Sequence, residues 1–97
     1  MKAYKHLVSY ALKRGFTISV WDGEEWQVRS STDKAAIIEA VESVEVAQLR
    51  IKEDGNEVGW ALIIPFGLED DETVADMTIT PAMVKWDELY FARPFEL

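Results

Sequence analysis

Two stretches of the chain alternate apolar and polar residues on either side of a tight turn, and this pattern constrains the fold more than any other feature. The first spans residues 16–29 and has an Asp-Gly turn at 22–23. The second spans residues 46–64 and has an Asp-Gly turn at 54–55. A period of two is typical of strands with one buried face, and Asp-Gly between two strands is a strong hairpin signal. The sequence therefore predicts two β-hairpins.

The alternation also assigns side chains to the two faces of the predicted sheet. In the last strand of the second hairpin it predicts an inward set: Val58, Trp60, Leu62 and Ile64. The outward face is expected to carry Trp21, Arg29, Arg50 and Lys52, with Gly59, Ala61 and Ile63 beside them. An aromatic ring among three cations is the layout of a platform for single-stranded nucleic acid. We favour a solvated face instead, because one ring is a thin stacking surface and the net charge opposes nucleic-acid binding.

Three helices are expected around these hairpins. Apolar residues recur at helical spacing over residues 3–14, about 33–44 and about 81–92. Residues 73–79 are expected to form either a short fifth strand or an irregular segment, and we favour the irregular segment. The order α-β-β-α-β-β-α predicts an α+β fold in one domain over residues 1–97, with a four-stranded antiparallel-rich sheet and helices mainly on one face.

Composition limits the chemistry that this chain can perform. With 97 residues, 48% of them hydrophobic, the chain can bury one modest core despite a net charge of −8. It has no cysteine, which excludes disulfides, thiolate nucleophiles and cysteine-ligated metals. No run approaches the roughly 20 apolar residues of a membrane span, and the first residues lack a signal-peptide core. We therefore expect a cytoplasmic protein without a membrane partner.

The negative charge is concentrated in the second half of the sequence. Residues 1–21 carry +4, residues 22–52 carry −3 and residues 53–97 carry −9. Direct nucleic-acid binding by the whole molecule is therefore not expected, and a basic protein is an electrostatically easier partner.

No group of residues predicts catalysis, and we expect no enzymatic activity and no cofactor. His6 is the only histidine and is expected on the outer side of the first helix, beside Lys2 and Lys5. A general base needs an orienting partner, and no acid lies near it in the sequence. An ordinary surface histidine is the favoured interpretation.

The run Glu69-Asp70-Asp71-Glu72 is expected to form a solvated loop. It lacks the ligand order of a calcium loop, so no metal site is predicted, although a metal-dependent enzyme that uses these carboxylates is one alternative. The same residues are candidates for contact with a basic partner. A further alternative is that the protein mimics nucleic acid and inhibits a host DNA- or RNA-binding protein.

Met83, Trp86 and Tyr90 form a stripe along the last predicted helix. Their i, i+3, i+7 spacing is that of a helix that anchors in a partner's groove, although most such stripes belong to the core. Val84 and Phe91 lie off this stripe, so the helix is apolar on more than one side. A homodimer contact through this helix is therefore one hypothesis.

Two segments carry a resemblance to a known class of proteins. They are SVWDGEEWQV over residues 19–28 and GWAL over residues 59–62. In these segments, and in the order of elements over most of the chain, the sequence resembles small uncharacterised accessory proteins of tailed bacteriophages. The resemblance implies a protein made in the bacterial host cytoplasm during infection, with no assigned reaction and no functional residues to carry over.

Taken together, these features predict a small acidic binding module without enzymatic activity that acts through protein–protein contact. The candidate contact residues are those of the predicted outward face, the acidic run and the helical stripe.

Overall fold

The structure is a computed structural model that describes residues 1–91. The expected end of the last helix at residue 92 lies outside the described residues. The elements follow in the order α1 (Ala3–Lys13), β1 (Thr17–Trp21), β2 (Trp26–Ser31), α2 (Lys34–Glu42), β3 (Ala47–Glu53), β4 (Asn56–Ile63), the 3₁₀ turn η1 (Asp70–Thr73), β5 (Val74–Met77) and α3 (Pro81–Phe91).

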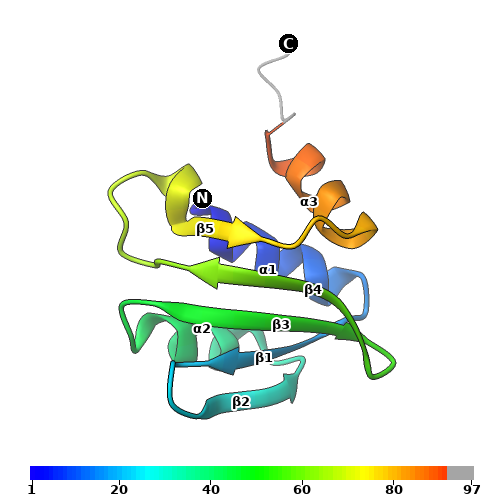
Figure 1. The fold of residues 1–97 in the computed structure, drawn as a ribbon, viewed down its shortest axis with the longest axis horizontal. Helices are drawn as coiled ribbons and strands as arrows, with labels where there is room; N and C mark the ends of the chain where they lie inside the picture. The colour runs from blue at the N-terminus through cyan, green and yellow to red at the C-terminus, as the bar shows by residue number, and fades with distance from the viewer. Residues whose placement is uncertain (92–97) are drawn as a thin grey trace.

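The strands form one sheet in the order β2-β1-β3-β4-β5, and every neighbouring pair is antiparallel (Figure 1). The predicted α+β class and antiparallel sheet are confirmed. The predicted number of four strands is wrong, because Val74–Met77 adds a fifth strand at the edge beside β4. This strand has only four residues, which is too short for an alternating pattern to distinguish a strand from an irregular segment.

All three helices pack against the same face of the sheet. Their buried side chains share one core with the inward residues of β1, β3 and β4. In Figure 1, α1 and α2 lie behind the sheet. The third helix joins them through α1, where the Tyr10 hydroxyl donates to the Ala82 carbonyl at 2.8 Å. Within residues 1–91 no helix covers the opposite face, which faces the viewer in Figure 1 and which we call the open face.

The orientation predicted for β4 is wrong by one residue. Ile51 pairs with Gly59, whereas Lys52 pairs with Glu57, so Val58 is the extra residue of a β-bulge next to the turn. Beyond this bulge the alternation is reversed. Gly59, Ala61 and Ile63 are buried and face the helices. Trp60 and Leu62 therefore point to the open face.

Gly59 allows α3 to approach the sheet closely. A Cβ atom on this residue would lie 2.6 Å from Sδ and 2.7 Å from Cγ of Met83. Real Cβ atoms essentially never come so close to another atom. The absent side chain thus makes room for Met83, which is 1% exposed and fills the space between α3 and β4.

The sequence pattern predicts His6 on the outer surface of α1, and this prediction is wrong. Its Nδ1 accepts a hydrogen bond at 3.1 Å from Nε1 of Trp86, and its ring meets the Tyr90 ring edge-on at 5.1 Å between centroids. The histidine connects α1 to α3. Helical periodicity alone could not show this, because α3 packs on a side of α1 that carries polar residues.

Candidate binding surface

Three tryptophans lie on the open face, where sequence analysis had placed one. Alternation correctly places Trp21 there. Trp26 joins it because a register shift in the first hairpin pairs Trp21 with Trp26 and Val20 with Val28, so that Gln27 is the extra residue. Trp60 lies on this face because the bulge in the second hairpin reverses the orientation of β4. Both missed residues therefore depend on a β-bulge, which hydrophobic alternation does not predict.

The three indole rings are partly exposed and held in place by their neighbours. Trp21 and Trp26 meet edge-to-face with centroids 5.1 Å apart. Nε1 of Trp60 donates to the side-chain oxygen of Gln48 at 3.0 Å. The Arg29 guanidinium lies 5.8 Å from the centre of the Trp26 ring. Such contacts limit the rotamers of the rings and thus lower the entropy cost of binding a partner.

A hollow of about 320 Å³ lies beside Trp26 on this face. Its lining consists of an indole ring, three cations, two hydroxyls and one carboxylate: Trp26, Arg29, Arg50, Lys52, Ser19, Ser30 and Glu57. We call it the basic hollow. The structure thus brings together the three cations that the sequence analysis assigned to one face.

The charges in the basic hollow are only partly compensated. Nη1 of Arg50 lies 3.2 Å and 3.4 Å from the two carboxylate oxygens of Glu57. Within residues 1–91, neither Arg29 nor Lys52 has a carboxylate within ion-pair distance. The hollow therefore carries a local positive charge on a protein whose net charge is −8.

The first hairpin turn fixes one end of this surface. The Asp22 carboxylate accepts hydrogen bonds from the backbone N–H groups of Glu24 at 2.7 Å and Glu25 at 2.8 Å. It also accepts one from the Gln27 side chain at 2.6 Å. These bonds, with the backbone donors as the main cause, lower the pKa of Asp22 below its ordinary value.

The acidic run is partly ordered rather than a simple solvated loop. Glu69, Asp70, Asp71 and Glu72 are all exposed, and η1 begins within the run. Thr73 anchors it from below, because its buried hydroxyl donates to the Asp70 carbonyl at 2.8 Å and accepts from the Tyr4 N–H at 3.3 Å. Among residues 1–91, no group of three or more His, Asp or Glu side chains is placed to hold a metal ion. Contact between this run and a basic partner stays a prediction.

The helical stripe belongs to the core. Met83, Trp86 and Tyr90 are each 1% exposed. The Trp86 and Tyr90 rings stack with centroids 5.5 Å apart, and the Tyr90 hydroxyl donates to Asp71 at 2.6 Å. These three side chains are therefore not accessible to a partner in the folded chain. The exposed apolar side chains of α3 are Val84, Leu89 and Phe91.

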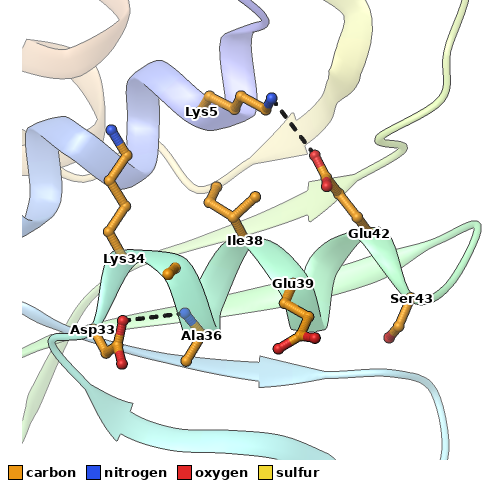
Figure 2. A pocket seen from close by; sticks show the side chains of 9 residues that line it. Lys5, Asp33, Lys34, Ala36, Ile38, Glu39, Glu42 and Ser43 are labelled. Atoms are coloured by element: carbon orange, nitrogen blue, oxygen red, sulfur yellow. Dashed lines mark hydrogen bonds and ion pairs between the residues drawn. The ribbon is translucent and has the colours of Figure 1, made fainter.

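A second, wider hollow lies over α2 (Figure 2). The figure shows Lys5 reaching Glu42 across it, with 3.7 Å between the charged atoms, and Asp33 capping the helix through the Ala36 N–H. The Tyr4 hydroxyl also donates to Glu42, and burial together with this carboxylate raises the pKa of Tyr4. Lys5, Glu42 and Asp33 are thus already paired within the protein, and the other two charged residues of the lining, Lys34 and Glu39, have opposite signs. This hollow is therefore a weaker candidate than the basic hollow.

Comparison with known proteins returns no matching family model, no matching curated protein and no matching solved structure. Within the part of the chain that the structure describes, no helix is both long and apolar enough to cross a membrane. The function is therefore inferred from the geometry of the open face.

Proposed function

We propose that this protein is a non-enzymatic binding module whose open face is the contact surface for a protein partner. The observation that carries the proposal is the presence of three partly exposed tryptophans on a sheet face that no helix covers within residues 1–91. The outer face of an antiparallel sheet is usually polar, and an aromatic surface rimmed by charge marks an interaction site.

The chemistry of the face supports a protein contact. Tryptophan and arginine are enriched among the residues that dominate binding energy at protein interfaces, and the open face combines Trp21, Trp26 and Trp60 with Arg29 and Arg50. Leu62 extends the apolar part toward β5, where it pairs with Asp76.

A protein is favoured over a nucleic-acid strand because carboxylates stand at both ends of the face. Antiparallel pairing places the turn at residues 22–25 at one end of the sheet and the turn at residues 53–56 at the other. Each turn carries acidic side chains. A polyanion that followed the strands would meet them at either end, and the net charge of the molecule would add to the repulsion.

The resemblance to phage accessory proteins adds a proposal about the partner, namely that it is a protein of the bacterial host.

The proposal is tested by removing two rings that the core does not need. We expect that a W21A/W60A variant loses at least about tenfold in partner recovery from a bacterial lysate, because truncating a hot-spot tryptophan costs roughly 2 kcal/mol or more. L89A is the matched control, since Leu89 is 46% exposed on α3 and not on the open face. Recovery is measured by quantitative mass spectrometry of proteins captured by each immobilised variant.

Circular dichroism must first show that W21A/W60A keeps the wild-type fold. Equal recovery of the same proteins by the wild type, W21A/W60A and L89A would contradict the proposal.

A further inference from the structure

We propose that the basic hollow is a binding site for a phosphate monoester, held by Arg29, Arg50 and Lys52. This inference rests on the proposed function in one respect only: the site lies on the same open face, where it would anchor one phosphate group of the bound molecule.

The charge of the hollow matches that of a dianion. Three cations line it and one carboxylate, Glu57, compensates one of them, which leaves about two positive charges. A phosphate monoester carries about −1.5 to −2 near neutral pH, whereas a carboxylate carries −1. A carboxylate ligand would therefore leave one cation uncompensated. Nothing in the composition makes such a cluster expected, since acidic residues outnumber basic ones by 18 to 10.

The donors in the hollow suit the oxygens of a phosphate group. Arginine presents a planar fork of N–H donors that fits phosphate, and the Trp26 ring beside Arg29 restricts this fork before any ligand arrives. The Ser19 hydroxyl accepts the Ser30 N–H at 2.8 Å, which leaves its own proton to donate. Ser30 has a φ of 45°. This left-handed conformation is unusual for serine, and such backbone strain is often found at functional sites.

The size and surroundings of the hollow favour one phosphate group over a polymer. Its volume of about 320 Å³ lies at the lower end of the range for small-molecule pockets. The acidic turns at both ends of the face oppose a second or third phosphate along the strand direction. We therefore infer a single monoester, carried either by a small metabolite or by a phosphorylated side chain of the protein partner.

Glu57 has a specific role in this arrangement, because its carboxylate occupies Arg50 while no ligand is bound. It competes with the phosphate group for that guanidinium. Removing the competitor should strengthen binding, and an exposed ion pair of this kind accounts for about two- to fivefold in affinity.

The test is a titration of the isotope-labelled full chain, followed by NMR at constant ionic strength. The probes are inorganic phosphate, a phosphoserine peptide and adenosine monophosphate, with sodium chloride as the reference salt. We expect saturable shifts of the Trp26 indole N–H and of the Ser30 and Arg50 amides. Affinity should fall at least tenfold in R29Q/K52Q and rise about two- to fivefold in E57Q.

K13Q/K34Q is the matched control, because it also removes two positive charges and both lysines are exposed on helices away from the open face, Lys13 on α1 and Lys34 on α2. It should bind as the wild type does. Tighter binding of the phosphopeptide would identify a protein-borne phosphate, and tighter binding of the nucleotide would identify a small metabolite; both outcomes support the site.

Three results would overturn the inference. The first is equal chemical-shift changes with chloride, and the second is unchanged phosphate affinity in R29Q/K52Q with a wild-type fold. The third is tighter binding of a (dT)₈ oligonucleotide without a terminal phosphate than of any monoester. The last would replace the monoester by a nucleic-acid strand. If phosphate binding fails while partner recovery still depends on Trp21 and Trp60, this inference is wrong and the proposed function stands.

Discussion

At the scale of single residues, the Asp22 carboxylate organises the first hairpin turn. It is an acceptor for two backbone N–H groups and for the Gln27 amide. The turn then holds Trp21 and Trp26 opposite each other, so that their rings meet on the open face. One acidic side chain therefore determines the spacing of two rings that we assign to partner binding.

These bonds predict how the turn responds to acid. The pKa of Asp22 is lower in the folded chain than its ordinary value of 3.8, so the ionised carboxylate stabilises the fold at pH values above 3.8. This stabilisation is lost as the pH falls through the lower pKa of the folded state. We expect an NMR titration of the Asp22 carboxyl to have its midpoint below 3.8, with the Glu24 and Glu25 amides following it. In D22N these amides should lose that response. A midpoint at or above 3.8 would contradict the prediction.

At the scale of secondary structure elements, the two β-bulges decide what could be predicted from the sequence. The hairpins, the three helices and the outward positions of Trp21, Arg50 and Lys52 follow from periodicity and turn chemistry. The bulge at Val58 reverses the faces of β4, and the bulge at Gln27 turns Trp26 outward. A bulge depends on pairing between strands, so a local pattern does not reveal it.

The close approach of α3 to β4 leads to a second prediction. Gly59→Ala should lower the free energy of unfolding by about 1–3 kcal/mol, because the new methyl group overlaps Met83 in a packed core. G67A is the control, since its Cβ would meet only the Ile64 carbonyl at an ordinary 3.4 Å and the Ile64 side chain at 3.8 Å. Urea denaturation measures both.

A double-mutant cycle shows whether the overlap with Met83 causes this loss. In an M83A background, which removes the overlapping atoms, G59A should cost clearly less than in the wild type. Equal costs in the two backgrounds would exclude the overlap as the cause.

At the scale of the whole molecule, the fold assigns its two sheet faces to different tasks. The inner face builds the core with three helices, and the open face carries Trp21, Trp26, Trp60 and the basic hollow. Four members of this surface follow from alternation and two more from the bulges. The buried state of Met83, Trp86 and Tyr90 could not be predicted, since a stripe at helical spacing looks the same whether it faces a core or a partner.

The exposed side of α3 leads to a prediction about self-association. Phe91 is 48% exposed, and Val84, which is 36% exposed, lies two helical turns before it on the same side of α3. If the homodimer hypothesis is correct, light scattering at high concentration should give a mass near twice the 11.1 kDa of one chain, and V84E should return it to that of one chain. L68E is the control, because Leu68 is 99% exposed and lies outside α3. A wild-type mass of one chain at all concentrations would exclude the homodimer.

The placement of the tryptophans has an optical consequence. Three of the four indoles in the chain lie on the open face, and the fourth, Trp86, is 1% exposed in the core. Most of the ultraviolet emission of the protein should therefore come from the surface that we assign to binding, while Trp86 supplies a steady internal reference. Binding at the open face should therefore change the wavelength and the intensity of the tryptophan fluorescence, so that it can be followed without an attached dye.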